Sequence, residues 1–312
     1  MVGTATTAPT EDTTEPTVWG LIGNTPLIPI ATDAARDTGG RLFLKAEWLN
    51  PGGSVKDRPA REIMRVGLAE GALPRKRLLD ASSGNTAVAY AMLGAAARIG
   101  VTVCVPANAS SERFRLLAVF GAEVVETDPM EGSDGAIRRA RELAAAEPER
   151  YWYADQYGNR ANPVSHYRTT GPEIWRQTGG AITHLVAGVG TSGTLMGAGR
   201  FLKEKSSDVQ LISVEPDAAF HGLEGLKHMA SALVPGIYDP SLIDRQVFVD
   251  TESSESAVRT LAQERGLFVG WSTGAALVAS DQLLGEGDAT VVVVAPDGGG
   301  RYLSETRRWA RG

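Results

Sequence analysis

Cysteine is almost missing from this 312-residue sequence, and its single example is Cys104. One cysteine excludes an intrachain disulfide, which fits a reducing compartment, so we expect a cytoplasmic protein. Cys104 lies in the apolar run at residues 101–106. A cysteine in such a run behaves as a small hydrophobic residue, and we interpret Cys104 as part of a buried strand rather than as a reactive thiol.

Long apolar runs and concentrated positive charge are also missing. No run approaches the roughly 18 apolar residues that a membrane-spanning helix needs, so no membrane association is predicted. The formal net charge is −6 and no basic stretch stands out, which argues against a nucleic-acid partner. Residues 1–16 are rich in Thr, Pro and Glu and lack a signal-peptide pattern, so we expect a disordered tail there. No metal site is predicted.

The chain does contain a regular alternation of apolar strand-like runs and helical patterns. Most of the runs are continuous Val, Ile and Leu, as in strands buried on both faces of a parallel sheet. This alternation predicts an α/β fold, and the length allows two lobes, each with a mostly parallel twisted sheet flanked by helices. The expected strands are residues 42–45, 77–81, 101–106, 123–127, 183–188, 209–214 and 290–295, and the expected helices are 58–72, 86–99, 111–120, 135–146, 194–204 and 275–284.

The loop Gly-Val-Gly-Thr-Ser-Gly-Thr at residues 188–194 joins an expected strand to an expected helix. Its backbone N–H groups and the start of the helix favour a phosphate group, and Thr191, Ser192 and Thr194 add hydroxyl donors. The same letters match the dinucleotide pattern G-x-G-x-x-G, with Glu215 at a suitable distance, so an NAD-dependent oxidoreductase is an alternative. The density of hydroxyl groups favours a single phosphate monoester, and a purely structural turn is the third interpretation.

Two further loops carry hydroxyl groups. Residues 270–274 fit the G-x-S-x-G pattern of hydrolases, but all four histidines precede Ser272, so the serine–acid–histidine order of that fold cannot be completed. Ser272 is then either a helix cap or a contact to a ligand. Residues 82–86 (Ser-Ser-Gly-Asn-Thr) surround one glycine at a helix start, which suits either a carboxylate ligand or ordinary capping.

Lysine is scarce, with six examples, and Lys56 follows the Pro-Gly-Gly turn at residues 51–53. By itself it reads as a solvated lysine. Together with the three loops, however, the sequence resembles the cysteine synthase (O-acetylserine sulfhydrylase) family of fold-type II enzymes that use pyridoxal 5'-phosphate (PLP). The resemblance runs from about residue 20 to residue 304 and is closest to the B-type cysteine synthases. It rests on residues 22–27, 50–58, 82–86, 156–159, 166–173, 188–194, 270–274 and 296–304.

The resemblance implies a role for each matching residue. Lys56 is expected to bind PLP covalently and to act as the catalytic base, and Ser272 to meet the pyridine nitrogen. The cofactor phosphate is expected on Gly190, Thr191, Ser192, Gly193 and Thr194, with Asn85 at the ring hydroxyl. The substrate α-carboxylate is expected on Ser82, Ser83, Asn85, Thr86 and Gln156.

The resemblance also implies an activity and an organisation. We expect replacement of the β-substituent of an O-activated L-serine, O-acetylserine foremost, by a sulfur donor, through an α-aminoacrylate, to give L-cysteine or S-sulfocysteine. A different nucleophile, as in diaminopropionate or cyanoalanine synthesis, is the alternative. We expect a homodimer of chains with a large PLP-binding domain (17–52 and 158–312) and a smaller mobile domain (53–157). No protein partner is indicated.

Several positions depart from the pattern of the family or of its subgroups, and two of them bear on the substrate and the pocket. Asp217 stands where members that use O-phosphoserine carry an arginine, which argues against a phosphate leaving group. Trp271 stands where a small aliphatic residue is usual, so it either reshapes the pocket or fills the core.

Overall fold

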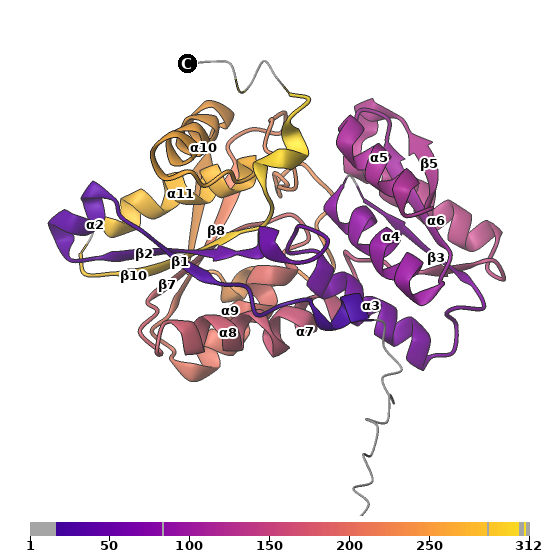
Figure 1. The fold of residues 1–312 in the computed structure, drawn as a ribbon, viewed down its shortest axis with the longest axis horizontal. Helices are drawn as coiled ribbons and strands as arrows, with labels where there is room; N and C mark the ends of the chain where they lie inside the picture. Colours follow the sequence, from indigo (N-terminus) through magenta and orange to yellow (C-terminus); the bar gives the residue numbers. More distant parts are fainter. Residues whose placement is uncertain (1–16, 83, 286, 306–308, 310–312) are drawn as a thin grey trace, which may run out of the picture.

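The computed structural model describes residues 17–82, 84–285, 287–305 and 309. The tail expected at residues 1–16 lies outside this part of the chain. The described residues form two units side by side, each a sheet covered by helices, as expected for the α/β fold (Figure 1). No helix in the described ranges is long and apolar enough to cross a membrane.

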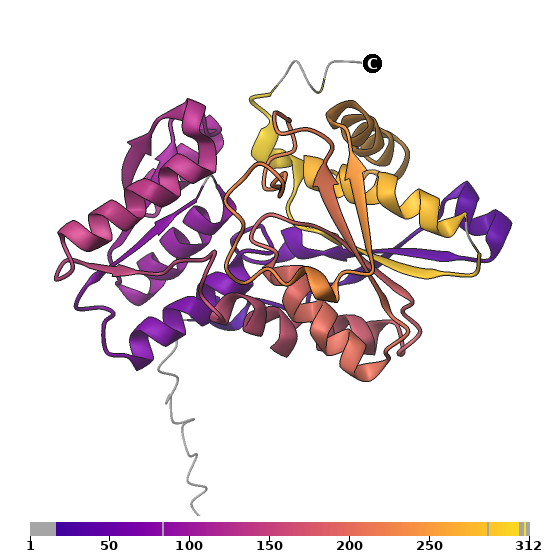
Figure 2. The same ribbon diagram turned by 180° about the vertical axis from the view of Figure 1, so that it is seen from behind.

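The larger unit is built on a six-stranded sheet. Its strand order is β1 (Leu27–Ile30), β2 (Arg41–Ala46), β10 (Thr290–Ala295), β7 (His184–Gly188), β8 (Gln210–Pro216), β9 (Arg245–Val249). All neighbours are parallel except β1 and β2. One face carries α10 (Thr251–Arg265) and α11 (Trp271–Leu284). The other carries α7 (Ala161–Arg168), α8 (Thr170–Gln177) and α9 (Gly193–Lys205) (Figures 1 and 2).

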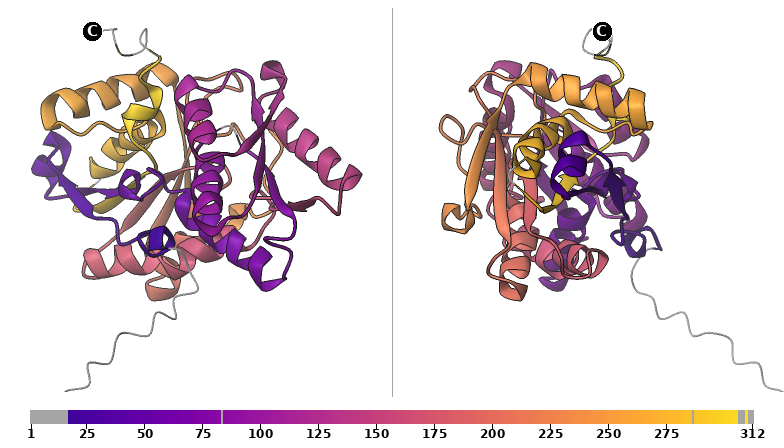
Figure 3. Two further views of the ribbon diagram at one scale, coloured as in Figure 1. Left: turned by 45° about the vertical axis from the view of Figure 1, so that its right-hand side comes forward. Right: turned by 90° about the vertical axis from the view of Figure 1, so that its left-hand side faces the viewer.

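The smaller unit contains a four-stranded, fully parallel sheet. Its order is β5 (Glu123–Thr127), β4 (Val101–Pro106), β3 (Arg77–Ala81), β6 (Tyr151–Tyr153). Helices α4 (Asn85–Ala97), α5 (Ser111–Val119) and α6 (Gly132–Ala146) cover it. Helix α3 (Asp57–Ala69) packs against both α4 and α7 and so lies at the junction of the two units, as the views in Figures 1 and 3 show.

The seven expected strands and six expected helices are all present, with ends that shift by a few residues. Three strands were not expected: β1, β6 and β9. They are short or only partly buried, and β1 contains Pro29, so none shows an apolar run as long as those of the expected strands. Helices α7, α8 and α10 were also not expected, together with the short α1 (Thr17–Gly20) and α2 (Asp33–Thr38).

Each sheet is buried on both faces. Strands β4 and β10 are buried along their whole length, which explains their unbroken runs of Val and other apolar residues. Cys104 on β4 is fully buried, and burial raises the pKa of its thiol to about 12. The thiolate is therefore suppressed, as expected for a cysteine inside a strand.

The parallel strands place their following loops at one edge of each sheet. The loops after β2, β3, β7 and β10 all end near the junction of the two units, because parallel strands share one carboxyl edge. These are the loops that carry Lys56, Asn85, Thr191 and Asp297.

Candidate active site

Ten of the twelve predicted site residues line one continuous cavity between the two units. Its inner part contains Lys56, Asn85, Ser272 and the loop after β7, and its outer part also contains Lys56 and Asn85. Gly193 does not line the cavity, and Ser83 lies outside the described residues. The ten are Lys56, Ser82, Asn85, Thr86, Gln156, Gly190, Thr191, Ser192, Thr194 and Ser272.

Lys56 is held in place by its own turn. The N–H of Gly52 donates to Asp57 Oδ2 at 2.5 Å, and the Arg301 guanidinium donates to the Gly52 carbonyl. Val55 N donates to the Pro296 carbonyl at 2.8 Å, so the turn is fixed against the segment that follows β10. Burial lowers the pKa of Lys56, and the carboxylate of Asp297 opposes this shift. Within the described residues, Lys56 Nζ makes no hydrogen bond.

The loop after β7 has the geometry of a phosphate site. Ser192 adopts a left-handed conformation with φ of 68°, and its buried hydroxyl has no hydrogen bond within the described residues. Gly190 is required here, because a Cβ would lie 2.0 Å from the Gly225 carbonyl. At Gly193 a Cβ would lie 1.9 Å from Asn162 Oδ1, so this glycine permits close packing beneath the loop.

Two residues without a predicted role fix the hydroxyls of this loop. Asn162 Nδ2 donates to Thr191 Oγ1 at 3.2 Å, and His166 Nε2 lies 3.3 Å from Thr194 Oγ1. Burial, with the nearby charge of Arg58, lowers the pKa of His166 to about 3, so its ring is neutral at physiological pH. Both residues lie on α7, a helix that the sequence did not predict.

The dinucleotide alternative for this loop is not supported. Glu215, which would bind a ribose, accepts from Met229 N at 3.1 Å and also from the Gln246 amide. It is fully buried and does not line the cavity. The letters of the dinucleotide pattern are thus present, but its acidic residue serves the packing of β8.

The loop at residues 82–86 combines capping with an opening toward the cavity. Ser82 Oγ accepts from Gly84 N and Ala87 N, both at 3.1 Å, so this hydroxyl caps α4. Thr86 Oγ1 donates to Gln156 Oε1 at 2.7 Å, and both side chains face the cavity. The capping and ligand interpretations of this loop are therefore compatible.

Ser272 is not the cap of α11, because that position belongs to Gly270. Ser272 is the second residue of the helix and faces the inner cavity, and its hydroxyl makes no hydrogen bond within the described residues. Its neighbour Trp271 is fully buried and stacks on Trp309 with ring centroids 3.9 Å apart. Trp271 therefore fills the core and does not reshape the pocket.

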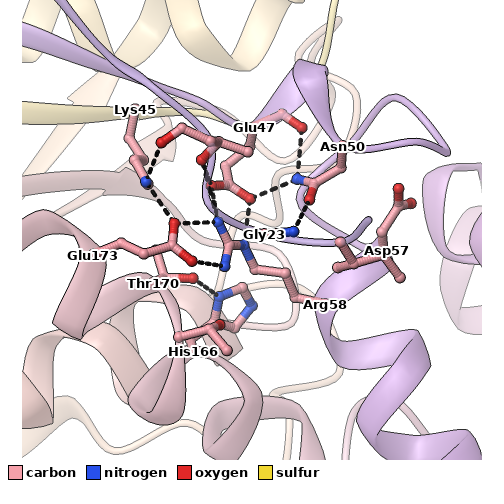
Figure 4. Close-up of polar contacts among 12 residues, drawn as sticks. Gly23, Lys45, Glu47, Asn50, Asp57, Arg58, His166, Thr170 and Glu173 are labelled. Atoms are coloured by element: carbon pink, nitrogen blue, oxygen red, sulfur yellow. Dashed lines mark hydrogen bonds and ion pairs between the residues drawn. The ribbon is translucent and has the colours of Figure 1, made fainter. Parts of the chain in front are cut away.

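A buried network of charges surrounds Arg58 at the start of α3 (Figure 4). Arg58 donates to Glu47 at 2.7 Å and to Glu173 at 2.8 Å, and Lys45 donates to Glu173 at 2.6 Å. Burial by itself would raise the pKa of Glu173, but hydrogen bonding and charge from Arg58, with help from Lys45, lower it to about 2. Two positive and two negative charges thus balance inside the protein at the start of α3.

The cavity fits a molecule that carries an aldehyde, a polar ring and a phosphate. An amine is available at Lys56, and the start of α9 offers the backbone and hydroxyl groups of a phosphate site. In the part of the chain that the structure describes, the buried Ser192 Oγ and Asn85 Oδ1 lack hydrogen-bond partners. The sequence missed four other charged residues of the cavity: Asp297 and Glu224 in the inner part, and Arg113 and Lys227 in the outer part. Only Asp297 falls within one of the motifs noted above.

Comparisons with known proteins agree with this geometry. A family model described as pyridoxal-phosphate dependent enzyme matches residues 18–297. A cysteine synthase of Aquifex aeolicus is 48% identical, over 92% of this chain and 90% of that protein. A cysteine synthase B of Pseudomonas aeruginosa is 39% identical, over 93% of this chain and 96% of that protein.

A solved structure shows the same fold. The crystal structure of O-acetyl serine sulfhydrylase isoform 3 from Entamoeba histolytica matches with a TM-score of 0.85 at 31% identity, over 97% of this chain and 93% of that one. The chain therefore belongs to the pyridoxal-phosphate dependent enzymes, within the branch that contains the cysteine synthases.

Proposed function

We propose that this enzyme replaces the acetate group of O-acetylserine by a sulfur nucleophile and so forms L-cysteine, or S-sulfocysteine when thiosulfate is the donor. The observation that carries the proposal is the convergence of Lys56, the phosphate-type loop after β7 and the hydroxyl-bearing loop after β3 on one cavity. The similarity to cysteine synthases over nearly the whole chain supports it.

The inner cavity would hold the cofactor. Gly190, Thr191, Ser192, Gly193 and Thr194 would bind its phosphate at the start of α9, where the helix dipole favours negative charge. Asn85 would lie beside the ring hydroxyl and Ser272 at the ring nitrogen. When bound, PLP withdraws electrons from the substrate Cα, which allows the Cα proton and the β-substituent to leave. A neutral serine at the ring nitrogen limits this withdrawal, which favours β-replacement over transamination.

Lys56 would transfer the proton. Burial lowers the pKa of its amine, so a larger share is unprotonated near neutral pH and can accept a proton. The amine takes the Cα proton, and acetate leaves with the electron pair of the Cβ–O bond. The sulfur atom then bonds to Cβ, and Lys56 returns its proton to Cα.

The outer cavity would bind the rest of the substrate. Ser82, Ser83, Asn85, Thr86 and Gln156 would receive the α-carboxylate through side-chain and backbone donors. Arg113 and Lys227 also line the outer cavity. These cations would attract sulfide or thiosulfate, both of which are anions, toward Cβ.

We further propose how the chain is organised. Residues 53–157 would form a smaller domain that closes on the large domain (17–52 and 158–312) when the carboxylate binds, and closure would exclude water. We also propose a homodimer in the cytoplasm. These points rest on the resemblance and on the single buried cysteine, Cys104.

The visible spectrum of the purified enzyme tests the proposal first. We expect a yellow, PLP-loaded protein whose band shifts when O-acetylserine is added and returns when sulfide or thiosulfate follows. Cyanide and amines, tried in place of sulfur, test the alternative nucleophiles. Lys56→Ala is the control and should lose both the band shift and turnover. A yellow protein that ignores O-acetylserine but responds to O-phosphoserine would contradict the proposed leaving group.

A further inference from the structure

Asp297 is a buried acid in the inner cavity to which the proposed mechanism gives no role. It follows β10, is 1% exposed and lines the cavity with Lys56 and Ser272. Its Oδ2 accepts from Asn85 Nδ2 and from Tyr302 Oη, each at 2.6 Å. Its Oδ1 is buried and has no hydrogen bond within the described residues. A buried carboxylate of this kind is costly and therefore calls for an explanation.

The contact with Asp297 determines which way the Asn85 amide points. A carboxylate can only accept hydrogen bonds, so the Asn85 NH₂ group must face it. The Asn85 oxygen then points away from Asp297, and it is buried without a hydrogen-bond partner among the described residues. Asn85 lines both parts of the cavity beside Lys56, so a donor on the bound ligand could satisfy this acceptor.

We propose that Asp297 is a positioning residue: it locks the Asn85 amide with its oxygen toward the nitrogen of Lys56, and this acceptor favours a proton on that nitrogen when the cofactor is attached to it. The proposal rests on the proposed attachment of the cofactor to Lys56 but not on any substrate. A neutral amide at position 297 could donate or accept, so it would permit both orientations of Asn85. The charged acceptor permits one, and at 2.6 Å it forms a strong contact.

Other ionisable groups also surround Lys56. Tyr302 bonds to Asp297, and the Arg113 guanidinium lies 5.3 Å from the centre of the Tyr302 ring. Glu224 lines the inner cavity and forms an ion pair with Arg113. Lys227 lines the outer cavity, as Lys56 does. His166 is also near enough for the charge of Lys56 to contribute to lowering its pKa. Burial lowers the pKa of the Lys56 amine, and the charge of Asp297 opposes this shift.

The pH dependence of the cofactor band tests this role without any amino-acid substrate. We expect Asp297→Asn to lose its yellow, protonated band at a pH about one unit lower than the unmodified enzyme. Tyr302→Phe is the matched control, because it removes the other hydrogen bond to the same oxygen and keeps the charge, and it should shift the band much less. Equal midpoints in Asp297→Asn and the unmodified enzyme, or no loss of the band in either up to pH 10.5, would overturn the proposal.

A double-mutant comparison separates positioning from direct charge. If Asp297 acts through Asn85, Asp297→Asn should shift the midpoint by less than half as much in an Asn85→Ala background. A shift of half or more would mean that Asp297 acts directly on Lys56, which contradicts the positioning role. No substrate is present in this experiment. A negative result would therefore not contradict the proposed β-replacement, and an enzyme that does not react with O-acetylserine could still be tested in this way.

A second measurement needs no change at position 297. Hydrogen exchange followed by NMR should show one slowly exchanging side-chain amide, identified by its loss in Asn85→Ala. Rapid exchange of the Asn85 amide in the cofactor-loaded protein would show that the contact with Asp297 does not persist, and would overturn the proposal even if Asp297→Asn fails to fold.

Discussion

His166 shows how a single side chain can make the stability of this enzyme depend on pH. It lies between Thr170 and Thr194 and is 1% exposed. Since the pKa of its ring falls from 6.5 to about 3 in the folded protein, the folded state carries it neutral. Between pH 6.5 and pH 3, His166 is protonated in the unfolded chain but neutral in the folded protein. The contribution of His166 to stability is therefore complete above pH 6.5 and is lost as the pH falls toward 3.

Replacing His166 by glutamine should remove this dependence. Between pH 6.5 and pH 5 the unmodified protein should lose about 2 kcal/mol of unfolding free energy relative to His166→Gln. Urea unfolding of both proteins at a series of pH values measures the difference. His228→Gln, at a partly exposed site, is the control and should track the unmodified protein. Parallel curves for His166→Gln and the unmodified protein would refute the assignment.

At the scale of elements, the buried charges of Figure 4 join the strand and the helices that position Lys56. Lys45 lies on β2, Arg58 on α3 and Glu173 on α8, and Glu47 follows β2. Asn24 N also donates to Glu173 Oε1 at 3.0 Å, so the segment before β1 is tied to the same acid. In such a network, removing one charge leaves its partner buried without compensation.

Glu173→Gln should therefore destabilise the protein by about 3–5 kcal/mol at neutral pH, as for other broken buried ion pairs. Because the pKa of Glu173 lies at about 2 when folded, the difference should persist above pH 4.5 and narrow as the pH falls toward 2. Denaturant unfolding measures it. Glu123→Gln is the control, since Glu123 pairs with Arg150 at 3.1 Å on the surface, where such pairs contribute about 0–1 kcal/mol. Comparable losses in the two variants would contradict the role of the network.

At the scale of the whole molecule, ion pairs connect the two units around the mouth of the cavity. Lys227 Nζ donates to Asp134 Oδ1 on α6 at 2.7 Å, and Arg113 on α5 pairs with Glu224. Burial by itself would raise the pKa of Asp134, but the hydrogen bonds from Lys227 and from Leu233 N hold it below its usual value. The Lys227 side chain is 6% exposed, so its buried charge depends on this partner in the other unit.

Asp134→Asn should favour an open arrangement, because Lys227 would remain buried with a weaker partner. If the free energy that favours the closed over the open arrangement falls by about 1 kcal/mol, the open population rises about fivefold. Hydrogen-exchange mass spectrometry of α5 and α6 should then show faster exchange, with a higher KM for O-acetylserine and a smaller change in kcat. Asp33→Asn, in the exposed pair with Arg36, is the control. Unchanged exchange in α6 would mean that the pair does not hold the units together.

Local patterns predicted the central elements well, because burial on both faces of a parallel sheet leaves a continuous apolar run, as in β4 and β10. The same reasoning could not find β1, β6 or β9, whose pairing depends on neighbours rather than on their own residues. The phosphate-type loop was also recognisable, since its strand, glycines and helix are consecutive. Its dinucleotide interpretation was wrong, because the sequence spacing of Glu215 does not reveal that this acid serves packing.

The sequence by itself determined the α/β class, the buried state of Cys104 and, through several weak motifs taken together, the PLP-dependent family. Only the tertiary structure decided which distant side chains meet: Asn85 with Asp297, 212 residues away, and Lys45 with Glu173, 128 residues away. Local propensity and periodicity act over a few residues. The Asn85–Asp297 contact forms because the two sheets bring their carboxyl edges together, and the Lys45–Glu173 contact forms because α8 packs on a face of the larger sheet, which contains β2. The orientation of Asn85 beside Lys56 is therefore a property of the folded chain and cannot be read from either segment alone.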